Sequence, residues 1–211
     1  DMSGDNVKDK ELFFDPEEKY ITKVYDKDWE FNYLEPTHYD EFDDIKFICD
    51  LHSWIKSRPI RIMTYPISKR MKGVLDQFNL YPNKFYPAKV LFNEKLHEYY
   101  VWQFFLDGMD KFTNFEHSTF CEWGSRKKTE NDIIKATSED ELDHIWMNKD
   151  WRYISFDKAV MKPEFKNMDC VDLPFPLGIV ISERLKNALE AVQPALTGFE
   201  IIECPIEFEY L

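Results

Sequence analysis

The sequence predicts an α+β fold with a mixed sheet, two related strand–helix–strand units and an N-terminal β section. Two segments place apolar residues at helical spacing behind a serine, and short apolar runs of strand length flank them. Hydrophobic residues make up 44% of the 211 residues, and aromatic residues make up 17%. A disordered chain lacks such apolar content, so we expect a sizeable folded core.

The N-terminal part of the chain is expected to be rich in strands. Residues 1–10 are polar and predict a flexible tail. Residues 19–25 and 29–34 have strand composition, and residues 47–55 are apolar and fit either a helix or a strand. The predicted division is a tail at 1–10, a β-rich section at 11–57 and an α+β domain with an internal repeat at 58–211, or one continuous domain at 11–211.

The first strand–helix–strand unit lies in the middle of the chain. Residues 60–63 predict a strand, and Ser68 is expected to cap a helix. Apolar residues of that helix recur at offsets of three, four and seven: Met71, Val74, Leu75 and Phe78. Residues 85–92 predict the return strand, and Pro87 places it at a sheet edge or at a bulge, because proline cannot donate to the ladder.

Three further elements are predicted after this unit. Residues 99–106 form a continuous apolar run, which is typical of a strand covered on both faces. Ser138 and Glu141 match a capping box, so a short helix should follow. The residues that we expect this helix to bury are Leu142, Ile145 and Trp146. Residues 151–156 alternate in polarity and predict a strand with one buried face.

The C-terminal unit repeats the first one. Residues 178–180 predict a strand, Ser182 a helix cap and residues 199–204 the return strand. The helix repeats the apolar spacing with Leu185, Ala188, Leu189 and Val192. Residues 67–76 align with residues 181–190, which indicates either a duplication or two independent solutions of the same folding problem. If the two strands of a unit pair as parallel neighbours, the crossover should be right-handed.

The net charge of −13 restricts the possible partners. Nucleic acids and anionic membranes bind clustered Lys and Arg, so we expect neither as a partner. A basic protein would be attracted and steered. Acidity also keeps a protein soluble, so the charge alone leaves both interpretations open.

The cysteines and the N-terminal residues indicate a reducing cytoplasm. No C-x-x-C pair occurs, so neither a structural zinc site nor a disulfide framework is expected. The four cysteines are widely spaced: Cys49, Cys121, Cys170 and Cys204. The N-terminal residues do not resemble a signal peptide, and no apolar run reaches the roughly 20 residues that span a bilayer.

Catalytic signatures are missing from the sequence. It contains no nucleophile elbow, phosphate-binding loop, dinucleotide fingerprint or zinc-protease motif. His117 next to Ser118 and near Cys121 is a weak candidate, because neighbouring residues on a strand point to opposite faces. We therefore expect no enzyme activity, no cofactor and no metal. The alternative is a small hydrolase that uses dispersed carboxylates and a histidine.

Two acidic clusters are the candidate partner-binding residues. The first cluster interleaves acids with aromatic side chains, which are typical interface anchors: Tyr39, Asp40, Glu41, Phe42, Asp43 and Asp44. The second cluster lies in the first turn of a predicted helix: Glu139, Asp140, Glu141 and Asp143. The second also has a simpler explanation, because acids in a first turn complement the helix dipole. A role in metal-dependent hydrolysis stays open for both clusters.

Near its C-terminal end the chain resembles a known bacterial family. PLGIVISERLK at residues 176–186, ALEA at 188–191 and LTGFE at 196–200 are similar to the closing motif of the eleventh immunity family of polymorphic toxin systems, formerly a domain of unknown function. Segments in the middle of the chain fit the same layout, so the resemblance covers roughly residues 60–211.

The resemblance implies a cytoplasmic protein that binds and neutralises a cognate toxin. The catalytic domains of such toxins are often basic, and an acidic inhibitor can mask them by charge complementarity. No catalytic residues carry over, and the matching residues have structural roles: Ser182, Leu185, Leu189, Gly198 and Phe199. Gly198 is expected in a turn or at positive φ. The toxin, the contact surface and the oligomeric state stay open, including self-association through exposed aromatic side chains.

Overall fold

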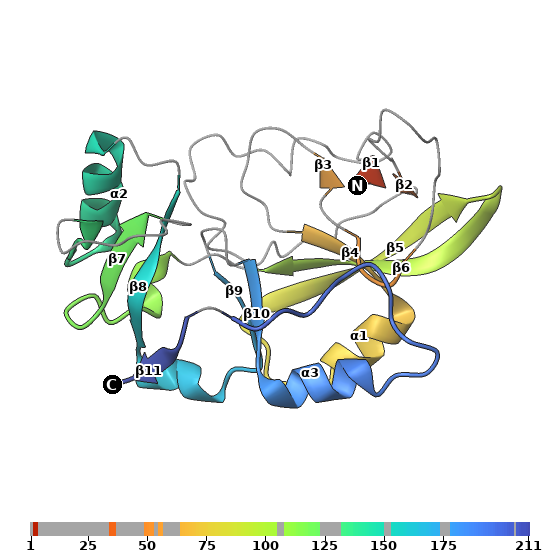
Figure 1. Ribbon diagram of the computed structural model, residues 1–211. Coiled ribbons are helices and arrows are strands. Elements are labelled where there is room, and N and C mark those ends of the chain that lie inside the picture. Colours follow the sequence, from red (N-terminus) through yellow and green to blue (C-terminus); the bar gives the residue numbers. More distant parts are fainter. Residues whose placement is uncertain are drawn as a thin grey trace. The chain divides into compact units, whose positions relative to one another are not determined.

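The computed structural model describes residues 2–3, 34–36, 49–52, 55–56, 64–104, 108–122, 132–149, 153–173, 178–204 and 206–211 (Figure 1). The architecture is α+β with mixed sheets, as predicted. The chain forms two compact units, which are described separately. Unit 1 comprises Asp1–Leu106 and Ser182–Ile201, and unit 2 comprises Asp107–Ile181 and Ile202–Leu211. This division differs from the boundary expected after residue 57 and from the alternative of one domain at 11–211, because residues on both sides of position 57 belong to unit 1 and residues 182–201 return to it.

Unit 1 is built on a three-stranded antiparallel sheet. Its elements are β1 (Met2–Ser3), β2 (Glu35–Pro36), β3 (Ile55–Lys56), β4 (Thr64–Ser68), α1 (Lys69–Leu75), β5 (Asn83–Phe92), β6 (Lys95–Phe104) and α3 (Glu183–Glu190). The main sheet has the order β4–β6–β5, and a small mixed sheet has the order β2–β1–β3. Met2–Ser3 pair with both neighbours in the small sheet, so the prediction of a flexible tail is wrong for these two residues.

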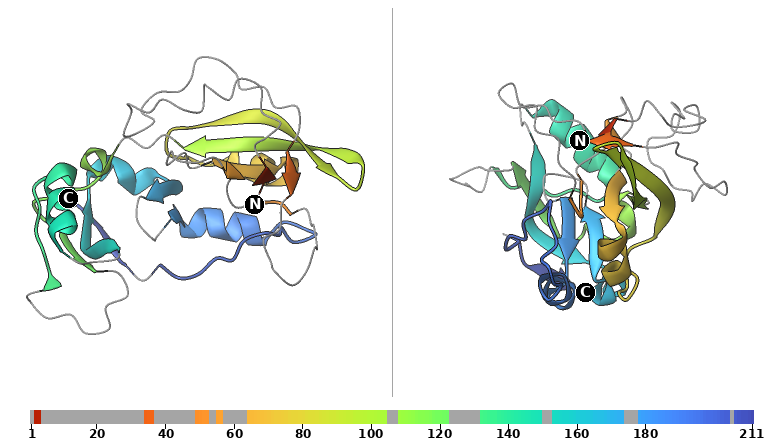
Figure 2. Two further views of the ribbon diagram at one scale, coloured as in Figure 1. Left: turned by 90° about the horizontal axis from the view of Figure 1, so that it is seen from above. Right: turned by 90° about the vertical axis from the view of Figure 1, so that its right-hand side faces the viewer.

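The strand β6 is central in the main sheet and buried on both faces from Val101 to Phe104, as its continuous apolar run predicts. Trp102 stacks on Phe85 of β5, with ring centroids 5.8 Å apart. β5 is at the edge of this sheet and Pro87 is exposed in it, which confirms the edge prediction. The long β5–β6 hairpin is visible in Figures 1 and 2.

The two capped helices begin as predicted. The Ser68 hydroxyl accepts a hydrogen bond from Met71 N, and the Ser182 hydroxyl accepts one from Leu185 N, both at 3.2 Å. The aligned positions of both helices are buried: Met71 and Leu75 in α1, Leu185 and Leu189 in α3. α1 and α3 contact each other, and the Arg184 guanidinium lies 5.5 Å from the centroid of the Phe78 ring. The repeated segments thus pack together.

Two of the predicted strands of the repeat are observed: β5 is the return strand after α1, and a strand at Gly178–Ile181 precedes α3. β4 and β5 both pair antiparallel with β6 and lie on its opposite sides, so they are parallel to each other but are not neighbours. The connection that contains α1 therefore crosses over β6, and the condition for the predicted crossover of neighbouring strands is not met. Residues 60–63 lie outside the described residues. The predicted return strand at 199–204 is wrong, because the described residues there have no strand structure. The chain just before them is instead fixed by bonds from Asp50 N and Leu51 N to Thr197 O, at 3.0 and 3.1 Å.

Unit 2 combines a three-stranded mixed sheet with a two-stranded one. Its elements are η2 (Met109–Lys111), β7 (Thr119–Glu122), α2 (Glu139–Asn148), β8 (Ile154–Met161), η4 (Pro163–Asn167), β9 (Cys170–Leu173), β10 (Gly178–Ile181) and β11 (Phe208–Tyr210). The larger sheet has the order β11–β8–β7, with β11 parallel and β7 antiparallel to β8. Phe120 packs on Phe115 and Phe156, with ring centroids 5.5 and 5.1 Å apart.

Two predictions for unit 2 need correction. Ile154, Ser155 and Phe156 are all buried, so the alternation predicted for this strand is wrong. β8 is the central strand of its sheet, and both faces of the strand are covered at residues 154–156. The solvent-exposed face that we expected is therefore absent from these residues. α2 buries Leu142 as expected, whereas Ile145 and Trp146 are only half-buried.

Candidate functional site

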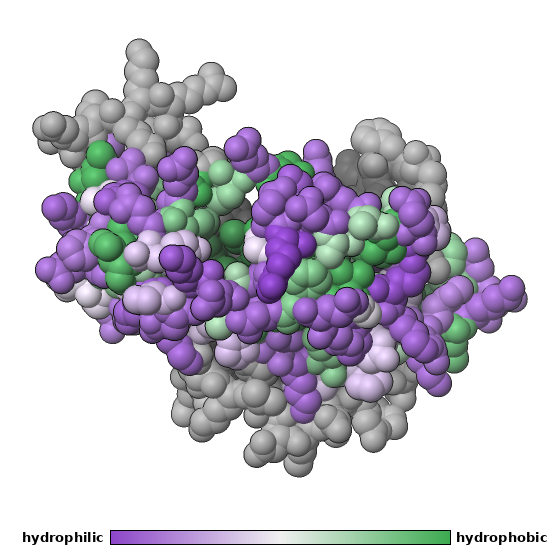
Figure 3. All heavy atoms as spheres, turned by 90° about the horizontal axis from the view of Figure 1, so that it is seen from below, coloured by the Kyte–Doolittle hydropathy of each residue, from purple (hydrophilic) through white to green (hydrophobic). Residues whose placement is uncertain are grey.

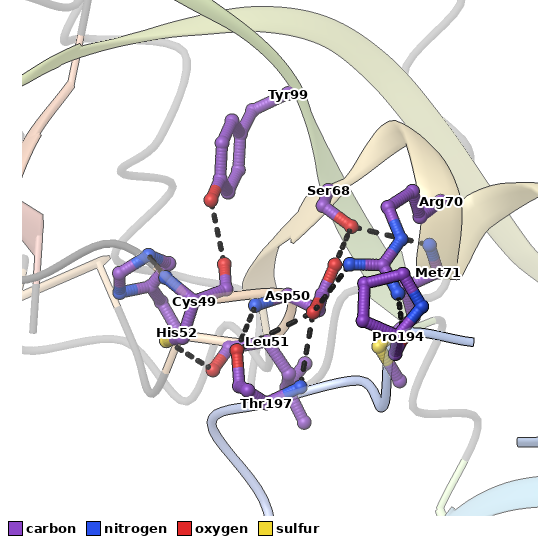
Figure 4. Close-up of polar contacts among 10 residues, drawn as sticks. All are labelled: Cys49, Asp50, Leu51, His52, Ser68, Arg70, Met71, Tyr99, Pro194 and Thr197. Carbon is purple, nitrogen blue, oxygen red and sulfur yellow. Dashed lines mark hydrogen bonds and ion pairs between the residues drawn. The ribbon is translucent and has the colours of Figure 1, made fainter. Parts of the chain in front are cut away.

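A cluster of polar side chains in unit 1 is the best candidate for an active site (Figure 4). Its centre is Asp50, whose side chain is almost fully buried. The carboxylate accepts hydrogen bonds from Ser68 Oγ at 2.5 Å and from Thr197 N at 3.0 Å. Arg70 lies 3.7 Å from the same carboxylate and also donates to Pro194 O. Three segments that are distant in sequence therefore meet at one carboxylate.

The neighbouring side of the cluster is formed by Cys49, His52 and Tyr99. The Tyr99 hydroxyl donates to Cys49 O at 2.6 Å, and the Cys49 thiol donates to Leu51 O at 3.0 Å. His52 Nε2 accepts from Cys49 N at 3.2 Å, so this ring nitrogen carries no proton. The rings of His52 and Tyr99 lie 5.8 Å apart in a tilted arrangement.

The protonation states in this cluster suit packing better than catalysis. Burial lowers the pKa of His52 to about 4, so the imidazole is neutral at pH 7. Burial also raises the pKa of the Cys49 thiol and of the Tyr99 phenol, which keeps both groups protonated. A protonated, hydrogen-bonded thiol is a weak nucleophile.

None of the hydrogen bonds described above for the cluster joins a nucleophile to a histidine base. Ser68 Oγ donates to Asp50 and accepts from Met71 N as a helix cap. His52 Nε2 accepts from a backbone N–H instead of a hydroxyl or a thiol. The triad logic needs a base within hydrogen-bond reach of the nucleophile. We interpret the cluster as a clamp, called the Asp50 clamp below, that joins residues 49–52, the start of α1 and the loop at 194–198.

Gly198 makes this close approach possible. Its φ of 94° agrees with the positive φ that the resemblance implies. A Cβ atom at this position would overlap Leu51 O and would lie 2.6 Å from Cys49 Sγ. Sequence reasoning missed Asp50 and Thr197. The available signal was a single acid inside the apolar run at 47–55, since a buried acid needs partners.

The candidate histidine of the hydrolase alternative lies in unit 2. His117 is exposed, whereas Ser118 and Cys121 are buried. The Ser118 hydroxyl donates to Val160 O at 3.1 Å and accepts from Val160 N at 3.0 Å, so it bridges to β8. Both described hydrogen bonds of the Ser118 hydroxyl are therefore with the backbone of β8, and neither is with the His117 side chain.

The second acidic cluster lies at the start of α2. Ser138 Oγ accepts from Glu141 N at 3.2 Å, and Glu141 Oε2 accepts from Thr137 N at 2.7 Å. The predicted cap is thus confirmed, with the carboxylate reaching one residue before the serine. Glu139 is buried, and its carboxylate accepts a hydrogen bond from Met109 N at 2.7 Å. This side chain therefore bonds within unit 2. We therefore remove Glu139 from the candidate contact residues.

The remaining acids of this cluster are exposed to different degrees. Asp140 and Glu141 are exposed, and Asp143 is half-buried. Hydrogen bonds from Thr137 lower the pKa of Glu141, so it is ionised at neutral pH. The first cluster, from Tyr39 to Asp44, lies outside the described residues.

Most of the large exposed apolar side chains in the described part of the chain lie in unit 2. Met147 is 78% and Ile202 is 74% exposed, and the other large apolar side chains of the described residues with high exposure are Leu96, Tyr153, Tyr210 and Leu211. Of these six, only Leu96 belongs to unit 1. Hydrophilic side chains cover most of the face drawn in Figure 3, with smaller apolar areas between them.

The two units also differ in charge. Unit 2 has 18 Asp and Glu against 10 Lys and Arg, a net charge of −8 over 85 residues. Unit 1 has 22 against 17, a net charge of −5 over 126 residues. The smaller unit therefore carries the larger share of the negative charge.

Within the described ranges, no three His, Cys, Asp or Glu side chains gather in a way that could hold a metal ion. None of the helices in these ranges has the length and apolar character that a membrane crossing requires. Comparisons with models of known protein families, with curated proteins and with solved structures found no match.

Proposed function

We propose that this protein is a cytoplasmic immunity protein that binds a basic bacterial toxin domain and neutralises it by protein–protein contact. The proposal needs no cofactor, metal or bond-making step. The observation that carries it is the coincidence in unit 2 of the larger negative charge and, among the described residues, of five of the six highly exposed large apolar side chains. Exposed apolar side chains rimmed by charge mark interaction surfaces.

The outer face of α2 is the first surface that we assign to the toxin. One side of α2 carries Asp140, Asp143 and Met147, because the second and third of these residues follow the first by three and seven positions. Met is enriched at protein interfaces, and its flexible side chain adapts to a partner. Acids around such an anchor steer a basic partner and select against acidic ones. This arrangement fits a contact surface for Lys and Arg side chains.

The hydrolase alternative has less support from the geometry. The Asp50 clamp uses its serine, acid and histidine for internal hydrogen bonds, and Ser118 is bound to Val160. The exposed acids of α2 lie on a helix surface. Metal-assisted hydrolysis requires carboxylates that converge.

The direct test is to mix the purified protein with the product of the adjacent gene and to measure a complex by calorimetry and analytical ultracentrifugation. We expect a stable heteromeric complex and loss of the toxin's activity. Raising the salt concentration should slow association, because electrostatic steering is screened. No complex, or turnover of a substrate by the protein alone, would reject the proposal.

A matched pair of variants tests the assigned surface. Asp140→Lys with Asp143→Lys should weaken toxin binding about 10-fold or more, since it places like charges against a basic partner. The control is Glu183→Lys with Glu190→Lys, which makes the same charge change on exposed positions of α3 in unit 1. The control should stay within about 3-fold of the unmodified protein. Equal losses in both variants would mean that only the net charge matters.

A further inference from the structure

The short strand β11 is an open sheet edge in unit 2. It pairs in parallel with β8 on one side, and no described strand pairs with its other side. The 3₁₀ helix η4, which starts two residues after the end of β8, also contacts β11. Edge strands carry unpaired N–H and C=O groups that can accept another strand.

The outward-facing groups of this edge can be assigned from the register. Leu211 N donates to Met161 O at 3.2 Å, and the register pairs Tyr210 with Met161. In a parallel pair alternate residues bond to the same neighbour, so Glu209 and Leu211 belong to the set that faces β8. Phe208 and Tyr210 then direct their backbone N–H and C=O groups to the open side.

The surroundings of the edge are apolar and acidic. Residues 202–211 contain no Lys, Arg or His and carry three acids, Glu203, Glu207 and Glu209, all of them exposed. Glu209 pairs with Lys158 of β8 at 3.0 Å, whereas Glu203 and Glu207 have no ion pair with a described residue. Ile202, Tyr210 and Leu211 supply exposed apolar surface in the same segment. Natural edges are commonly protected by short strand length, charged side chains or Pro. β11 is three residues long and contains Glu209, whereas residues 206–211 contain no Lys and no Pro.

We propose that β11 is a strand-addition site for an extended basic segment of the toxin, in which Lys or Arg alternates with apolar residues. Main-chain hydrogen bonds to Phe208 and Tyr210 would supply affinity, and the acids would supply charge selectivity. This inference rests on the proposed function for the identity of the partner. It adds a second contact surface to the outer face of α2.

The charges decide between a basic segment and a second copy of this chain. Two β11 edges paired with each other would bring Glu207 and Glu209 of both copies close together. Like charges directly across a strand pair are destabilising. A basic strand turns the same positions into favourable cross-strand pairs. The open edge therefore favours a basic partner over self-association.

A peptide experiment tests the edge without the toxin. The probe is a capped peptide of about seven residues that alternates Lys and Val, a typical strand length. We expect the amide NMR signals of Phe208 and Tyr210 to shift on titration and their hydrogen exchange to slow. A peptide that alternates Glu and Val should bind at least about 10-fold more weakly. Equal binding of both peptides, or shifts elsewhere only, would overturn the inference.

Two controls separate strand addition from simple charge attraction. Methylation of one alternate set of peptide amides should abolish binding, and methylation of the other set should leave it, because only one set faces β11. Glu207→Lys should weaken the Lys–Val peptide about 10-fold, and Glu116→Lys, an equal charge change at an exposed position of unit 2, should have little effect. Insensitivity to both methylations contradicts the inference. So does concentration-dependent dimerisation of the unmodified protein that protects the amides of Phe208 and Tyr210 from exchange.

The same variant distinguishes this inference from the proposed function. If the toxin complex forms and Glu207→Lys leaves its affinity unchanged, the edge assignment is wrong and the immunity function stands. If the adjacent gene product does not bind but the Lys–Val peptide protects Phe208 and Tyr210, the immunity function is wrong and the edge is a binding site for another basic segment.

Discussion

Unit 1 and unit 2 both bury acidic side chains, but they differ in net charge and in the exposed apolar side chains of their described residues. In unit 1 a buried acid, Asp50, collects hydrogen bonds from distant segments, and the two capped helices bury their apolar faces. In unit 2 the acid excess is larger, and large apolar side chains such as Met147 and Ile202 are exposed. Buried residues stabilise both units, and we propose that recognition depends on the surface of unit 2. The following variants test this difference.

The largest effect is expected at Gly198. In Gly198→Ala the new Cβ would overlap Leu51 O, and the φ of 94° is unfavourable for alanine. We expect a loss of about 3 kcal/mol or more in the free energy of unfolding, measured by urea denaturation.

Gly73→Ala is the matched control for this glycine. Gly73 lies in α1, and a methyl group added there would meet no other part of the protein within 4 Å, so alanine should stabilise the protein by about 0.5–1 kcal/mol. Similar losses at both glycines would show that the tight approach in the Asp50 clamp does not matter for stability.

The second effect is a pH dependence from His52. Its pKa is lowered from 6.5 to about 4 in the folded state, so the unfolded state binds a proton more readily. The associated stability is complete above pH 6.5 and is lost as the pH falls to about 4. Between pH 7 and pH 4 we expect the unmodified protein to lose about 2–3 kcal/mol more of its free energy of unfolding than the variant His52→Gln loses. Parallel pH profiles of the two proteins would contradict a buried neutral imidazole.

A smaller difference is expected between the two helix caps. Ser182→Ala should cost about 1 kcal/mol, because it removes one cap. Ser68→Ala should cost about 2 kcal/mol, because it also removes the hydrogen bond to Asp50. Urea denaturation of both variants measures the difference. Equal costs would mean that the Asp50 clamp adds nothing to the cap.

The smallest effect on stability is expected at Met147 in unit 2. Met147→Ala should change the free energy of unfolding by less than about 0.5 kcal/mol, because the side chain is exposed. Toxin affinity should nevertheless fall about 5-fold or more if this side chain is an anchor. Leu142→Ala on the buried side of α2 should instead cost about 2–4 kcal/mol in stability. A large stability loss at Met147 would place this residue in the core.

Local features of the fold were predictable from the sequence because they depend on neighbouring residues. The caps at Ser68, Ser138 and Ser182 follow from side-chain bonds to backbone groups three positions away. The central position of β6 follows from its unbroken apolar run, and the edge position of β5 follows from Pro87. The excess of acid is likewise a property of composition.

Only the tertiary structure decided how these elements combine. The packing of α3 with α1 in unit 1, the hydrogen bonds between Asp50 and Thr197, and the burial of Glu139 join residues that lie far apart in the chain. The prediction of a return strand at 199–204 was wrong for the same reason, because distant residues decide the local structure: the preceding loop bonds to residues 50 and 51. Helix caps and apolar periodicity are set by bonds within a few residues. The roles of a buried acid and of an exposed methionine are set by whichever distant segment packs against them.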